Sequence, residues 1–142
     1  MTSHSWIYLP ILALLLLTIF VWLLTAKKRI QAVKAKRLSI KTVNLVDHSQ
    51  MPQDILLPGK SYDSQFQQPI LFFILLGFLS LNQINGIAWQ LVSWLFVIAR
   101  YWHCYEHLQS KNIRARTLAF ALASTCLFAM WLWFLALQLI GK

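Results

Sequence analysis

Residues 117–140 read TLAFALASTCLFAMWLWFLALQLI, a stretch of 24 residues without a charged side chain. About 20 apolar residues in a helix are enough to cross the hydrocarbon core of a bilayer. The stretch therefore predicts a transmembrane helix. Small residues recur within it, Ala119 with Ala123 and Ala121 with Thr125, and they would let another helix approach closely.

Three further stretches have a similar length and predict three more helices. Residues 6–26 form the first, and Pro10 lies in its first turn, where a missing N–H costs little. Residues 87–107 form another, whose second half is polar. Residues 61–81 begin with polar turns and are wholly apolar only over the last 13 residues. Either those polar turns lie at membrane depth beside protein or water, or the span is short and they lie among the headgroups.

The composition indicates a membrane protein and not a soluble one. The chain is 58% hydrophobic and 12% charged, whereas a soluble domain has about 25% charged residues. Its seven tryptophans suit the membrane–water boundary. We therefore predict an all-α fold, an integral membrane four-helix up-down bundle that forms a single domain over residues 1–142. The first span lacks the features of a cleaved signal peptide, so we expect a permanent helix.

Lysine and arginine are distributed unevenly among the connections. Of the 13 such residues, eight lie within residues 27–60, four lie within residues 100–116, and Lys142 follows the last span. Basic loops remain in the cytoplasm. We therefore expect residues 27–60 to form a cytoplasmic loop and both termini to lie on the non-cytoplasmic side. The same rule explains the net charge of +9, so no nucleic-acid partner is expected.

Polar residues gather at the expected cytoplasmic ends of the helices. Within each span they recur at helical spacing, so each set lines one helix face. The sets are Ser93, Arg100, His103 and His107 in the third span, Lys60, Ser64 and Gln67 around the start of the second, and Arg114 and Arg116 before the fourth. An arginine within a membrane span is costly unless it faces a partner or water. The pattern predicts a positive pocket suited to a carboxylate-bearing ligand or a thiolate.

Simpler interpretations of the same residues remain open. His103 and His107 have the spacing of metal ligands on a helix, but no acidic residue or cysteine stands at a convincing third position, so no metal is expected. Arg100 could also extend its charge to the membrane boundary without a catalytic role. Cys104 and Cys126 fall in different spans and are expected to be apolar core thiols.

Two stretches resemble motifs of the MAPEG family, the membrane-associated proteins of eicosanoid and glutathione metabolism. Residues 62–73, YDSQFQQPILFF, resemble the second-helix motif of the family. Residues 99–116, ARYWHCYEHLQSKNIRAR, resemble its third helix and following turn. The order of Arg100, His103, Asn112 and Arg116 in that stretch is similar to the bacterial branch. The resemblance covers residues 60–140 in detail and the whole chain in topology.

The resemblance implies a homotrimer that binds glutathione between subunits, in the bacterial inner membrane. It places Arg114 where the family has the arginine that holds the glutathione sulfur as a thiolate, so Arg114 is the expected catalytic residue. The other expected glutathione-binding residues are Lys60, Ser64, Gln67, Arg100, His103, His107, Asn112 and Arg116, with Lys60 and Arg100 holding carboxylates. The implied activity is that of a transferase or peroxidase acting on a lipophilic electrophile or hydroperoxide from the bilayer.

Helix two departs from the family pattern at three positions. Glutathione-binding members usually have Arg, Asn and Glu where this chain has Lys60, Ser64 and Gln67. Lys60 keeps the charge without a bidentate fork, and Gln67 loses the charge that would pair with the amino group of glutathione. These changes favour a second hypothesis, in which the chain is a non-catalytic MAPEG-type protein that binds a lipid or a partner.

Overall fold

The computed structural model describes residues 5–38, 51–110 and 112–141 of the chain. Every regular element in these residues is a helix, and four rods follow one another along the chain. The bounds are η1 (Ser5–Ile7), α1 (Tyr8–Lys34), α3 (Gln53–Asp63), η3 (Ser64–Phe66), α4 (Gln68–Leu81), α5 (Ile87–Tyr105), η4 (Glu106–Ser110) and α6 (Ile113–Leu139). The second rod consists of α3, η3 and α4, and η4 is a π-helical turn that continues α5.

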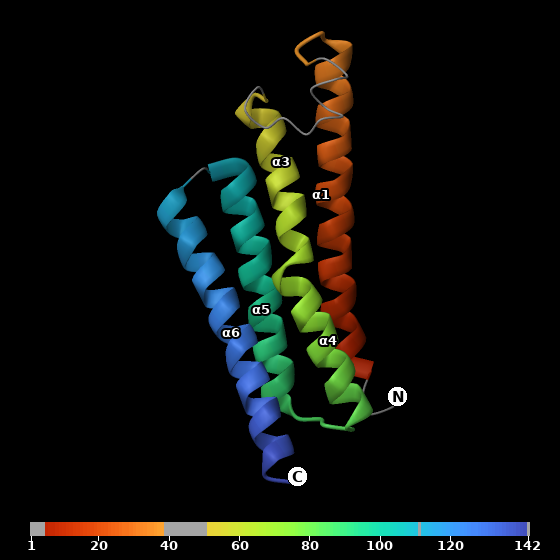
Figure 1. Ribbon diagram of the computed structural model, residues 1–142, viewed down its shortest axis with the longest axis vertical. Coiled ribbons are helices and arrows are strands. Elements are labelled where there is room, and N and C mark those ends of the chain that lie inside the picture. Colours follow the sequence, from red (N-terminus) through yellow and green to blue (C-terminus); the bar gives the residue numbers. More distant parts are fainter. Residues whose placement is uncertain (1–4, 39–50, 111, 142) are drawn as a thin grey trace.

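The four rods run side by side with alternating direction (Figure 1). α1 packs along α3, and α5 packs along α6. Both chain ends lie at one end of the bundle. The opposite end holds the C-terminal end of α1, the N-terminal end of α3 and the α5–α6 connection, and we call it the basic end after its lysines and arginines. The predicted four-helix up-down bundle is confirmed.

Length, composition and surface together indicate an integral membrane protein. α1, the second rod and α6 are long and apolar enough to cross a membrane. α5 has 19 residues and a polar second half, and it runs between two of these rods along the same bundle (Figure 1). Large hydrophobic side chains cover the outer faces, as at Leu12, Leu23, Phe128 and Leu132. A soluble monomer rarely exposes so large a continuous apolar surface, whereas lipid solvates it well.

Several helices extend beyond the apolar stretches that predict them. α1 continues to Lys34 instead of ending at residue 26, and α3 begins at Gln53 instead of near residue 61. α6 begins at Ile113, before the predicted start at residue 117. The predicted spans mark where apolar residues end, but a helix can continue into water because its hydrogen bonds are internal.

The connection between the first two rods is therefore helical at both of its ends. Arg37 follows α1 and donates hydrogen bonds from both terminal nitrogens to the Asp54 carboxylate of α3, each at 3.2 Å. Residues 39–50 of the predicted loop, with Lys41, lie outside the described residues, as do Lys111 and Lys142.

The second rod is interrupted within its predicted polar turns. Pro69 has no N–H, so it cannot donate to the carbonyl of Gln65 as an interior helical residue would. Gln67 adopts φ −99° and ψ −93°, well outside the helical range. The result is the short 3₁₀ segment η3 between α3 and α4, and this break in the second rod positions the site described below.

Stacked aromatic rings hold the rods together on the apolar side of the break. Phe72 of α4 stacks on Phe96 of α5 with ring centroids 4.4 Å apart, and both side chains are fully buried. Trp89 of α5 stacks on Trp133 of α6 at 4.2 Å. These contacts fix α5 between its neighbours, and they set which of its faces meets each rod.

Candidate functional site

A cavity of about 480 Å³ lies near the basic end, between the second rod, α5 and α6. We call it the polar cavity. Its lining residues are Leu57, Lys60, Asp63, Ser64, Gln67, His103, His107, Arg116 and Phe120. Six predicted site residues are in that set, drawn from three separate rods. The polar faces predicted from helical spacing therefore turn toward one another.

Two other predicted residues, Asn112 and Arg114, lie apart from this cavity. Asn112 is the N-cap of α6, and its side-chain oxygen accepts hydrogen bonds from the backbone N–H groups of Arg114 and Ala115 at 3.1 and 3.2 Å. This is the usual role of asparagine at a helix start. The Arg114 side chain is exposed in the first turn of α6 and does not line the polar cavity.

Arg100 is fully buried behind the polar cavity and is not part of its lining. Its Nη2 donates to the backbone oxygen of Ser64 at 3.0 Å and to the Ser64 hydroxyl at 3.1 Å. The same backbone oxygen accepts a long hydrogen bond, 3.5 Å, from the N–H of Gln67. Arg100 thus supplies a strong donor to a carbonyl at the break in the second rod. The structure shows this internal contact, and the contact of Arg100 with a ligand carboxylate stays a prediction.

His103 connects α5 to the first turns of α6. Its Nδ1 lies 3.2 Å from the backbone oxygen of Arg116. A carbonyl oxygen can only accept, so we assign the proton to Nδ1, which leaves Nε2 as the acceptor of the neutral ring. The ring also lies 6.0 Å from the His107 ring and 5.7 Å from the Phe120 ring, measured between centroids. This packing fixes the orientation of the imidazole at the cavity wall.

The Ser64 hydroxyl is already engaged within the protein. It donates to the backbone oxygen of Ser61 at 2.8 Å and accepts from Arg100. A hydroxyl has one proton, so Ser64 can offer a ligand only a remaining acceptor position. Lys60 and Gln67, in contrast, are exposed at the cavity.

Asp63 lines the cavity but is not among the site residues predicted from the sequence. It precedes Gln67 by four residues, a spacing that places both on one helix face, and that spacing could have identified it. The cavity therefore contains a carboxylate as well as the cations Lys60 and Arg116. Among the residues that the structure describes, no group of three or more His, Cys, Asp or Glu side chains is arranged to hold a metal ion.

The sequence profile of the MAPEG family matches residues 7–136, which is nearly the whole chain. The chain belongs to the MAPEG family. No curated protein and no solved structure matches it. The match confirms the resemblance found in residues 62–73 and 99–116.

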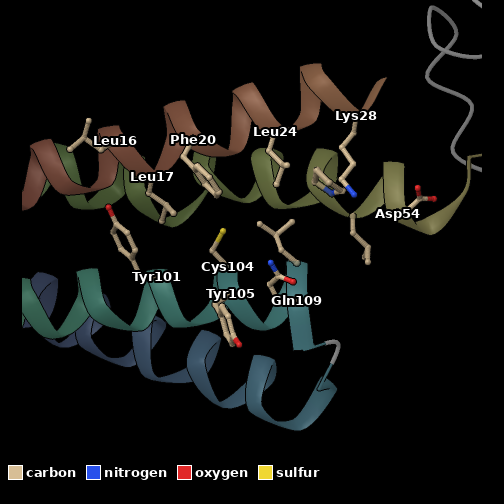
Figure 2. Close-up of a pocket in the computed structure, with 13 residues that line it drawn as sticks. Leu16, Leu17, Phe20, Leu24, Lys28, Asp54, Tyr101, Cys104, Tyr105 and Gln109 are labelled. Atoms are coloured by element: carbon tan, nitrogen blue, oxygen red, sulfur yellow. The ribbon is translucent and has the colours of Figure 1, made fainter. Parts of the chain in front are cut away.

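This MAPEG chain contains a second cavity, of about 600 Å³, between α1, α3 and the α5–η4 segment. We call it the apolar cavity, since leucines and aromatic residues dominate its walls. The lining residues are Leu16, Leu17, Phe20, Leu24, Lys28, Asp54, Leu57, Pro58, Tyr101, Cys104, Tyr105, Leu108 and Gln109. Figure 2 shows Cys104 and Tyr101 of α5 pointing toward α1 and the second rod. Leu57 of α3 lines both cavities, and their other lining residues differ.

Both cysteines of the MAPEG chain are free and buried. The Cys104 sulfur lies 3.4 Å from the Ser61 hydroxyl, in the contact between the two cavities. Cys126 lies in α6, within the main hydrophobic core. Cys104 lines the apolar cavity, Cys126 belongs to the core, and the two thiols are not joined by a disulfide.

Proposed function

We propose that this MAPEG protein binds glutathione in the polar cavity and uses it as a thiol-dependent transferase or peroxidase on lipophilic electrophiles. The main support is the convergence of six predicted residues, from three rods, on one cavity of about 480 Å³. Small-molecule sites commonly have volumes of about 300–1,000 Å³. The cavity is therefore of a suitable size for a tripeptide.

The charges of the cavity suit the charges of glutathione. That ligand has two carboxylates, one ammonium group and a thiol. Lys60 and Arg116 provide cations for the carboxylates or the sulfur, and Asp63 provides an anion for the ammonium group. Asp63, which lines the same cavity as Gln67, thus supplies the negative charge that Gln67 lacks. Gln67 can still hydrogen-bond a peptide group.

Bound glutathione would supply a thiol that, once deprotonated, attacks an electrophilic atom of the substrate. A nearby guanidinium favours the thiolate form. Arg116 lines the cavity of the protomer, so we propose it for this role within one subunit. Arg114, the residue implied by the family resemblance, is the competing assignment and would act if the site extends to a neighbouring subunit. His103 is suited to accept the thiol proton at Nε2, because Nδ1 is already engaged with the backbone.

We further propose that the chain acts as a homotrimer in the bacterial inner membrane. The basic end would face the cytoplasm, with both termini on the other side, as the positive-inside rule predicts. The ligand would then enter the polar cavity from the cytoplasm. The lipophilic substrate would approach from the bilayer, since the outer faces of the rods are apolar.

Titration of the detergent-purified protein with glutathione, followed by ultraviolet thiolate absorbance, tests this proposal. The matched variants are Arg116→Ala and Arg114→Ala, two residues apart in the same helix turn. We expect the wild-type protein and Arg114→Ala to form thiolate and Arg116→Ala to lose it. The opposite pattern would assign the sulfur to Arg114. The absence of any thiolate at millimolar glutathione, in a correctly assembled protein, would refute the enzymatic proposal.

A second candidate function is the non-catalytic binding of a lipid or a protein partner. The engaged hydroxyl of Ser64 favours it, because one expected donor to glutathione is unavailable. Calorimetry distinguishes the two functions. A protein that gives no heat of binding with glutathione, yet retains a lipophilic molecule through purification, would support the non-catalytic function.

A further inference from the structure

The apolar cavity is long, and Tyr101 lies at its inner end. There the Tyr101 hydroxyl donates to the backbone oxygen of Ala13 at 2.7 Å, and this bond joins α5 to α1. From Leu16 to Lys28, which both line the cavity, α1 rises by about 18 Å. The cavity is therefore elongated along the helix axes, and an extended apolar chain matches its shape.

The other end of the apolar cavity is polar and lies at the basic end of the bundle. Figure 2 shows Lys28 and Asp54 at this end, beyond the apolar side chains Leu24 and Phe20, and Gln109 across the cavity from Leu24. The Asp54 carboxylate is paired with Arg37 at 3.2 Å. Lys28 is the cation in the cavity lining, and because Asp54 is neutralised by Arg37, this end of the cavity carries a net positive charge. Basic residues next to a membrane attract anionic lipid headgroups.

The volume of the apolar cavity limits how much chain it can hold. A water molecule occupies about 30 Å³ in the liquid, and a methylene group is of similar size. A cavity of about 600 Å³ thus has room for about one long acyl tail and not for two.

From the shape, the volume and the charge, we propose that the apolar cavity binds one acyl tail of an anionic phospholipid from the bilayer. The phosphate of the headgroup lies at Lys28, and the second tail stays in the surrounding lipid. This site is distinct from the polar cavity, because the contact between Ser61 and Cys104 stands between the two. The proposal is thus independent of whether the protein binds glutathione.

Native mass spectrometry of the full-length protein, released from detergent in the presence of lipid, tests this assignment. The probes are phosphatidylglycerol and phosphatidylcholine with identical tails. Leu24→Trp fills the cavity, and its control is Leu23→Trp on the adjacent outward face, where Leu23 is 54% exposed. Lys28→Gln removes the charge at the polar end, and its control is Lys27→Gln, which does not line the cavity.

We expect the wild-type protein and both controls to retain phosphatidylglycerol about fivefold more than phosphatidylcholine. Leu24→Trp should lose both lipids, and Lys28→Gln should retain the two equally. Several results would overturn the proposal: equal retention of the two lipids by the wild type, unchanged retention in both Leu24→Trp and Lys28→Gln, or a lipid-free wild-type oligomer whose cavity another subunit covers. A preference for a free fatty acid over phosphatidylglycerol would also overturn it.

Discussion

The buried guanidinium of Arg100 offers the most direct test of how the break in the second rod is stabilised. Its Nη2 donates to the backbone oxygen and the hydroxyl of Ser64 at 3.0 and 3.1 Å. Arg100→Gln shortens the side chain, so the amide no longer reaches Ser64. The backbone oxygen of Ser64 then has only weak or distant hydrogen-bond donors, at a membrane depth where water is scarce.

The magnitude follows from two opposing contributions to the free energy of unfolding. A hydrogen bond from a charged donor contributes about 1.5–3 kcal/mol, and Arg100 makes two such contacts. Removing a buried charge also relieves its desolvation, which offsets part of that loss. We expect Arg100→Gln to lower the free energy of unfolding by about 2 kcal/mol. Ser64→Ala removes only the hydroxyl contact and should cost about 1 kcal/mol.

Circular dichroism during titration with a denaturing detergent measures these changes in the purified protein. Because Arg100 and Ser64 contact each other, the double variant should deviate from additivity by about 1 kcal/mol. Arg37→Gln is the matched control, since it also removes two hydrogen bonds to one residue, Asp54. That pair is exposed, so its loss should lower the free energy of unfolding by only about 0–1 kcal/mol. Wild-type stability in Arg100→Gln, or strict additivity with Ser64→Ala, would refute a stabilising role at the break.

The same titration checks two further contacts. Asn112→Ala should lower the free energy of unfolding by about 1 kcal/mol because α6 loses its N-cap, whereas Asn112→Asp should preserve it; equal losses would contradict the capping role. Phe72→Ala should cost about 3–5 kcal/mol because the ring is fully buried, while Phe128→Ala, 55% exposed on the outer face, should cost far less. Pro69→Ala restores an N–H, so hydrogen exchange should report a new protected amide at residue 69; an amide that exchanges freely there would show that proline does not cause the break.

Much of the fold was predictable because the bilayer imposes strong rules on sequence. The lengths of the apolar stretches predicted the number of rods, and the helical spacing of the polar residues identified the faces that meet in the polar cavity. His103 and His107 are the clearest case, since their spacing of four residues places both rings on the same wall. The resemblance of residues 62–73 and 99–116 to the family could also be recognised in the sequence, and it is confirmed.

Helix rotation was not predictable from spacing alone. Residues two apart differ by about 200° around a helix, so Arg114 and Arg116 cannot both face the same cavity. In the packing of α6 against α5, Arg116 lines the polar cavity and its backbone oxygen lies 3.2 Å from His103, while the catalytic role of Arg114 stays a prediction. Asp63 was not predicted, because the helix-two positions of the family pattern correspond to Lys60, Ser64 and Gln67.

The position of Arg100 depends on a feature that becomes visible only when two rods are considered together. On α5 it shares a face with His103 and His107, so it resembled a third ligand-binding residue. On the second rod, Pro69 withholds one backbone donor, and the helix breaks just before it. A carbonyl exposed at that depth requires a donor from protein, since lipid provides none.

The break, the buried arginine and the polar cavity therefore follow from one another. A guanidinium inside a membrane bundle is costly unless acceptors face it, and the break supplies the backbone oxygen of Ser64 as one. The same break turns polar residues of η3 and its flanks toward α5 and α6, where they line the polar cavity. A straight, fully bonded second helix would satisfy its own carbonyls and leave Arg100 without this acceptor. The proline that weakens the helix is thus what makes a polar cavity possible at this depth.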